Sequence, residues 1–186
     1  MRGPGKGKYG DNLRRALDYV VQSAKPSGLI NRTNEKRDMY NHGLATFVLT
    51  QAYGMSDDPR LSKTLDNALK FITDVQCEDG GWDYVGKRQA RGHDLSLAVM
   101  QAKALRGAMD VGLDIPPRSI DMAIRSVYRH YAPSSNQADG RGRLYSATDP
   151  LANFPGQDTY DGTRGTAAMA AAGGVCLQEF GTYDEW

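Results

Sequence analysis

The feature that most constrains the fold is an alternation of two kinds of predicted helix along the 186-residue chain. One kind carries a single apolar stripe, at steps of three and four residues, opposite a charged face; it covers residues 13–24, 61–72 and 120–131. The other kind is apolar or small on nearly every side and covers residues 44–53, 95–111 and 166–180. A helix that is apolar all round is buried all round. The order therefore predicts an all-α fold of about six helices in two layers, with inner helices lining an axis and outer helices shielding them from water.

An internal repeat supports this arrangement. The first two units match at a shift of 52 residues without a gap, which carries Gly28 onto Gly80, and a looser third unit follows at a shift of 55. Tetratricopeptide units have about 34 residues and HEAT units about 40 to 47, so the repeat length disfavours those solenoids. We predict one domain over residues 11–180, built from hairpins at about 11–54, 59–112 and 117–180, after a flexible segment at 1–10.

Local signals place the ends of the helices. Asp58 is a suitable N-cap followed by Pro59 at the first helical position, and Pro117 opens the next outer helix in a similar way. Gly54 and Gly112 mark the ends of inner helices. These signals predict inner helices near residues 40–54, 93–112 and 163–180, and a long loop at 133–162.

Composition excludes several classes of protein. The 23 basic and 22 acidic residues nearly cancel and are scattered, which argues against a nucleic-acid partner or an anionic membrane surface. Cys77 and Cys176 are far apart and lack metal-site spacing, so we predict free thiols. No stretch approaches the roughly 18 apolar residues of a membrane span, and none forms a signal-peptide core. The chain is therefore expected to be soluble and untargeted, cytoplasmic by default.

The segment from Gln76 to Trp82, Gln-Cys-Glu-Asp-Gly-Gly-Trp, follows the second outer helix. It resembles the glutamine-tryptophan motif of squalene and hopene cyclases and of related prenyltransferase repeats. The resemblance implies that the Gln76 amide bonds backbone at a helix end and that Trp82 stacks beside it, which ties neighbouring outer helices together. Gly80 and Gly81 make the turn, because glycine tolerates positive φ. The motif is therefore predicted to be structural.

The resemblance covers residues 11–180 and implies the α/α toroid of terpenoid cyclases and protein prenyltransferases. Complete toroids of this family contain more helices than are visible here, so we expect the chain to form half of one. A half toroid leaves its inner helices with an open apolar side. Either a missing second half belongs to a longer chain, or a homodimer completes the ring.

The candidate site residues lie near the predicted starts of the inner helices. In the 52-residue register His42 aligns with Asp94, and Asp161 stands at the start of the third inner helix. Parallel inner helices would bring these groups to one end of a cavity, where an acid can protonate an alkene and an imidazole can hold a metal. Asp94 is equally suited to cap its helix, and a lone histidine in this position is commonly a packed, hydrogen-bonded residue. The predicted catalytic candidates are Asp94, His42 and Asp161, and the predicted cavity or ligand-binding residues are Tyr40, His93, Ser96, Met100 and Tyr160.

Each chemistry of the family requires residues that the sequence can be checked for. Hopene-type cyclases protonate squalene with an Asp-x-Asp-Asp cluster, whereas His93-Asp94-Leu95-Ser96 offers one carboxylate. Prenyltransferase β subunits hold zinc with an Asp-x-Cys step, whereas Ser96 occupies the cysteine position and is a poor zinc ligand. We therefore predict no cofactor, and in particular no zinc.

Three functions are compatible with these observations. The leading prediction is a prenyltransferase and squalene-oxidase-type repeat protein that binds an apolar, isoprenoid or peptide ligand or acts as an interaction scaffold. The alternative is an isoprenoid enzyme, either a terpene cyclase or a prenyltransferase of the β type, whose catalytic half is missing. A carbohydrate-active enzyme that uses Asp94 and Asp161 as a carboxylate pair rests on their positions alone.

Overall fold

The computed structural model of the protein describes residues 4–32, 36–90, 92, 95–128, 130 and 167–182. Within these residues the chain is all-helical and contains no strands, which confirms the predicted all-α class. The six described helices are α1 (Gly10–Gln22), α2 (Asp38–Tyr53), α3 (Pro59–Asp74), α4 (Leu95–Asp110), α5 (Pro117–Tyr128) and α6 (Ala167–Glu179). The predicted loop at 133–162 and the site candidates His93, Asp94, Tyr160 and Asp161 lie outside the described residues.

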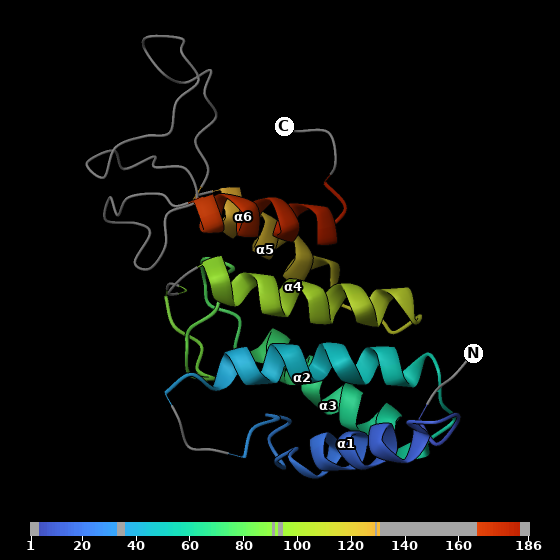
Figure 1. Cartoon of the computed structure of the whole chain (residues 1–186). Helices are drawn as coiled ribbons and strands as arrows, with labels where there is room; N and C mark the ends of the chain where they lie inside the picture. The colour runs from blue at the N-terminus through green and yellow to red at the C-terminus, as the bar shows by residue number, and fades with distance from the viewer. Residues whose placement is uncertain are drawn as a thin grey trace, which may run out of the picture.

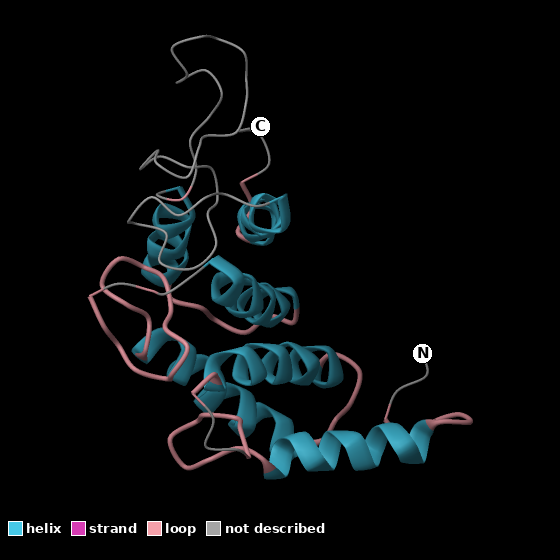
Figure 2. Cartoon of the chain, turned by 60° about the vertical axis from the view of Figure 1, so that its left-hand side comes forward, coloured by secondary structure: helices cyan, strands magenta, loops and turns pink. Residues whose placement is uncertain are grey.

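The helices are arranged in two layers (Figure 1). The inner layer consists of α2, α4 and α6, which lie side by side and run in the same direction. Helices α3 and α5 pack behind this layer, and α1 lies at one end of the array, as a second view shows (Figure 2). The helices predicted to be apolar all round therefore form the inner layer, with their N-terminal ends at the same side of the molecule.

Helix α3 shows how the local sequence determines where a helix begins and which of its faces is buried. The Asp58 side chain accepts a hydrogen bond from the Arg60 backbone N–H at 3.0 Å, and Pro59 occupies the first helical position, where no N–H is needed. The helix then buries its apolar stripe against the inner layer: Leu61, Leu65, Ala68, Leu69 and Ile72. The predicted start and buried face of this helix are confirmed.

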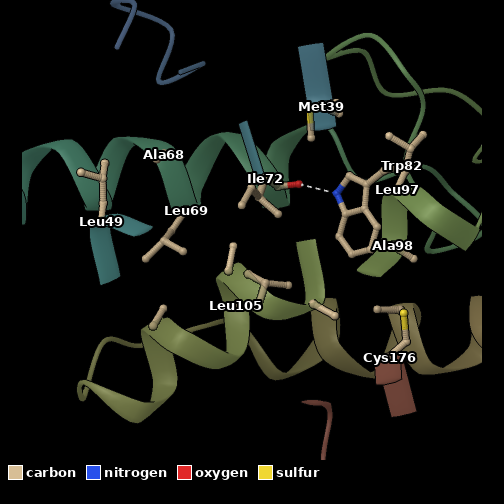
Figure 3. Packing of buried hydrophobic residues seen from close by; sticks show 14 of the residues in the cluster. Met39, Leu49, Ala68, Leu69, Ile72, Trp82, Leu97, Ala98, Leu105 and Cys176 are labelled. Carbon is tan, nitrogen blue, oxygen red and sulfur yellow. Dashed lines mark hydrogen bonds between the residues drawn. The ribbon is translucent and has the colours of Figure 1, made fainter. Parts of the chain in front are cut away.

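Helices α2 and α4 approach each other closely because glycines face the partner helix. A Cβ on Gly43 would lie 2.8 Å from the Met100 Cβ, and a Cβ on Gly107 would lie 2.3 Å from Thr50 Oγ1. A larger residue at either position would displace its neighbour. The buried apolar cluster includes this contact region and extends into the outer layer; its members include Leu49, Leu97, Leu105, Ile72 and Trp82 (Figure 3).

Two turn glycines that the sequence register pairs make the same kind of contact. Gly28 and Gly80 both have a φ of +92°. A Cβ on Gly28 would lie 2.2 Å from the Asn67 carbonyl oxygen on α3, and a Cβ on Gly80 would lie 1.9 Å from the Met122 carbonyl oxygen on α5. The turns that follow α1 and α3 therefore lie directly against the backbone of the next outer helix.

Candidate functional site

The N-terminal ends of α2 and α4 meet through two of the predicted site residues. The Tyr40 hydroxyl and Ser96 Oγ are hydrogen-bonded to each other, which joins the two inner helices. The Tyr40 ring centroid lies 5.9 Å from that of Tyr84, and the Arg37 guanidinium lies 5.6 Å from the Tyr84 ring centroid. We call the group Tyr40, Ser96 and Tyr84 the polar rim.

His42 is fully buried, and its partners lie in the connection before α2 and on α3 rather than at the polar rim. Its Nδ1 accepts a hydrogen bond from the Ile30 N–H at 3.0 Å, and its Nε2 donates to the Ala68 carbonyl at 3.2 Å. The ring also packs edge-on against Phe71, with centroids 5.1 Å apart.

The surroundings of His42 set its chemistry. Burial lowers its pKa from 6.5 to about 4, only partly opposed by the hydrogen bond to the Ala68 carbonyl, so the imidazole is neutral at neutral pH. Backbone groups engage both ring nitrogens, leaving neither free to act as a general base or to bind a metal. We therefore correct the predicted catalytic role of His42 to a structural one.

Met100, predicted to line a ligand cavity, contributes to helix packing. It is half-buried, and its Cβ and backbone lie directly over Gly43 on the neighbouring inner helix. An unbranched, polarizable side chain suits such an irregular gap between helices. We assign Met100 to the contact between α2 and α4.

The open side of the inner layer forms a second feature. The Lys103 ammonium on α4 donates to Glu179 Oε1 on α6 at 2.9 Å and lies 5.9 Å from the centroid of the Phe47 ring on α2. This line of contacts therefore crosses all three inner helices. One turn closer to the N-terminal ends, the same helices carry apolar side chains that are exposed or half-buried: Leu44, Val99 and Val175. We call this set the inner face: Leu44, Phe47, Val99, Lys103, Val175 and Glu179.

The inner face leads toward the polar rim. Tyr40 precedes Leu44 by one helical turn on α2, and Ser96 precedes Val99 by about one turn on α4. Leu44 is the most exposed of the large apolar residues on the inner helices, at 54%. The arrangement therefore combines an apolar strip, hydroxyl groups at one end of the strip, and an ion pair further along it.

The segment Gln76–Trp82 connects α3 to α5 through hydrogen bonds. The Gln76 Nε2 donates to the Gly80 carbonyl and to the Ser119 carbonyl in the first turn of α5, both at 2.9 Å. The Trp82 indole Nε1 donates to the Ile72 carbonyl on α3 at 3.0 Å (Figure 3). Gln76 and Trp82 are buried. These residues thus join backbone groups of two neighbouring outer helices.

Replacing Gln76 with leucine is expected to lower the free energy of unfolding by about 2 kcal/mol, because the two hydrogen bonds that its amide donates to backbone carbonyls are lost. Urea unfolding followed by circular dichroism measures this change. The control is Gln22→Leu on the exposed end of α1, which is expected to change stability by less than about 0.5 kcal/mol. Equal stability losses in the two variants would contradict the assigned role of Gln76.

Two polar residues that the sequence analysis missed hold backbone segments together through hydrogen bonds. Asp79 Oδ1 accepts from the N–H groups of Gly81, at 2.9 Å, and Gly92, at 3.1 Å. The position of Asp79 directly before a glycine pair is the signal that could have identified it, because aspartate commonly bonds the backbone two residues further along the chain.

Gln101 Nε2 donates to the Met39 carbonyl at 2.8 Å and so connects α4 to α2. The sequence signal that could have identified Gln101 is its position as a single glutamine in a helix that is otherwise apolar on most sides.

The described residues hold no group of three histidine, cysteine or acidic side chains arranged to bind a metal ion. Cys77 and Cys176 are buried free thiols. Burial raises the pKa of Cys77 to about 11 and also raises the pKa of Cys176, so both are protonated at neutral pH and are poor nucleophiles. The groups offered to a ligand by the polar rim and the inner face are hydroxyls, apolar side chains and an ion pair.

Comparison with known proteins finds neither a matching family model nor a matching curated protein. No helix within the described ranges has both the length and the apolar character needed to cross a bilayer. The relation to cyclase and prenyltransferase repeats therefore stays a prediction based on residues 76–82 and the order of the helices.

Proposed function

We propose that the protein is a scaffold of the prenyltransferase and squalene-cyclase repeat type that binds an apolar ligand along its inner face. The observation that carries the proposal is the 54% exposure of Leu44 on an inner helix that buries Met39, Leu49 and Ala52 in the core. Exposed apolar surface beside polar groups is typical of binding sites. The order of the hairpins supports an α/α toroid in which this face turns toward the central axis.

The chemistry of the site indicates the class of ligand. Leu44, Val99 and Val175 offer apolar contacts to an extended hydrocarbon chain. At the polar rim, the hydroxyls of Tyr40 and Ser96 bond each other, so this end of the apolar strip is polar. A long apolar molecule with one neutral polar end, such as an isoprenoid alcohol, matches this combination.

Farnesol is therefore expected to bind the purified chain, and Leu44→Glu is expected to weaken its binding at least about tenfold, since an apolar contact is lost and a carboxylate is introduced. Isothermal titration calorimetry gives the dissociation constant directly. Apolar burial also predicts a negative heat-capacity change of binding, obtained by repeating the titration at several temperatures.

The matched control is Tyr19→Glu, because Tyr19 is also 54% exposed but lies on the outer helix α1. This variant is expected to bind farnesol like the unmodified chain. Absence of farnesol binding, or equal weakening in both variants, would remove the inner face as the binding surface.

A further inference from the structure

An apolar groove runs along the end of the array, between α1 and α2. We call it the edge groove; it has a volume of about 210 Å³ and is lined by apolar side chains that include Leu13, Ala16, Leu17, Val48 and Met55. Leu13 is 49% exposed, Val48 44% and Met55 48%. A contiguous apolar surface of this kind is a candidate interface.

The second hairpin shows what covers the equivalent surface. The 52-residue shift carries Leu13 onto Leu65 and Ala16 onto Ala68, and both of these residues of α3 are fully buried. Ala68 lies under α2, where its carbonyl accepts a hydrogen bond from His42. The outer-helix wall of the edge groove therefore corresponds to a surface that the neighbouring inner helix covers in the second hairpin.

The other wall of the edge groove follows the same rule. The 52-residue shift carries Val48 of α2 onto Met100, and Met55, which follows the end of α2, onto Gly107. Met100 lies against Gly43 of α2, and Gly107 lies against Thr50 of α2. By this comparison the edge groove corresponds to a surface against which an inner helix packs.

Helix α6 has an exposed side that fits the edge groove. Cys176 is buried, whereas Ala168, Ala171 and Gln178 are exposed. The exposed side is thus made largely of small residues, which permit the close backbone approach that Gly43 provides on α2. It forms the opposite end of the inner layer from the edge groove (Figure 1).

We propose that α6 of a second copy of this chain packs into the edge groove, so that copies associate head to tail. Such a contact is heterologous: each copy contributes a groove to one neighbour and an α6 surface to another. The groove itself is separate from the proposed ligand-binding site, because none of its residues belongs to the inner face.

Light scattering on a size-exclusion column tests the association in the absence of any ligand. The unmodified chain is expected to elute with at least twice its chain mass of 20.4 kDa. Leu13→Glu places a carboxylate in the groove, and Ala171→Glu places one on the exposed side of α6. Each variant alone is expected to be monomeric, because every head-to-tail contact then contains one damaged surface.

Mixing the two variants gives the discriminating result. A Leu13→Glu chain keeps its α6 surface and an Ala171→Glu chain keeps its groove, so one intact contact can form and a heterodimer of twice the chain mass is expected. A symmetric contact between like surfaces would instead leave one of the two variants dimeric on its own, and that result would overturn the proposal.

Two further measurements complete the test. Tyr19→Glu lies on the same helix as Leu13 but outside the groove, and it is expected to leave the mass unchanged. Far-ultraviolet circular dichroism must show unchanged helix content in all three variants, since the substituted side chains of Leu13, Ala171 and Tyr19 are exposed. An unmodified chain that stays monomeric at every concentration, or association that survives Leu13→Glu, would overturn the proposal without touching the farnesol result.

Discussion

Gly80→Ala is expected to lower the free energy of unfolding by about 4 kcal/mol, which combines backbone strain with steric overlap. Gly80 has a φ of +92°, a conformation that residues with a Cβ rarely adopt. The added Cβ would also lie 1.9 Å from the Met122 carbonyl oxygen, far inside contact distance. The turn must therefore move away from α5, which breaks the bond that Gln76 makes to Ser119. Urea unfolding measures the loss, and a marginally stable chain would not fold at all.

Gly112→Ala is the matched control for this experiment. Gly112 has a similar φ of +79°, but a Cβ there would have no neighbour within 4 Å. Its expected loss is therefore strain alone, about 1 kcal/mol. Gly28→Ala should resemble Gly80→Ala, because its Cβ would lie 2.2 Å from the Asn67 carbonyl oxygen. Equal losses at Gly80 and Gly112 would show that the close approach between the turn and the next outer helix is unimportant.

The features predicted correctly from the sequence are those with local causes. Asp58 and Pro59 set the start of α3 through a side-chain cap and a fixed φ, and both effects act within a few residues. The turn at Gly80 was predicted for a similar reason, since the run Asp79-Gly80-Gly81 favours positive φ. The order of inner and outer helices was predictable because the apolar pattern of a helix reports which of its sides are buried.

Contacts between distant segments were not predictable in the same way. The register aligned His42 with Asp94 and suggested a shared cavity, but the partners of His42 are Ile30, 12 residues before it, and Ala68, 26 residues after it. Only the packing of α2 on α3 brings those backbone groups together. Burial depends on neighbours as well: Leu13 and Leu65 occupy equivalent places in the same apolar pattern, yet the first is 49% exposed and the second is fully buried.

Acid is expected to destabilise the protein through His42, by up to about 3 kcal/mol between pH 6.5 and pH 4. The pKa of His42 is 6.5 in the unfolded chain and about 4 in the folded protein, since burial disfavours the imidazolium. Between these values the unfolded state binds more protons, so the free energy of unfolding falls as the pH falls. Above pH 6.5 the ring is neutral in both states and the effect vanishes; below pH 4 both states are protonated and the loss is complete.

His42→Gln separates this contribution from that of the carboxylates, because glutamine does not titrate and retains amide groups for hydrogen bonding. The variant is expected to be less stable at pH 7, since it cannot reproduce both bonds to Ile30 and Ala68. Between pH 6.5 and pH 4 its unfolding free energy should fall less steeply than that of the unmodified chain, by about 1.4 kcal/mol per pH unit at most. The hydrogen-bond partners of His42 are backbone groups and its ring neighbour is Phe71, none of which titrates. The difference in slope between the two proteins therefore arises from titration of the imidazole. Parallel curves for the two proteins would mean that His42 accepts a proton in the folded state at its ordinary pKa, which a fully buried ring held between two backbone groups should not do.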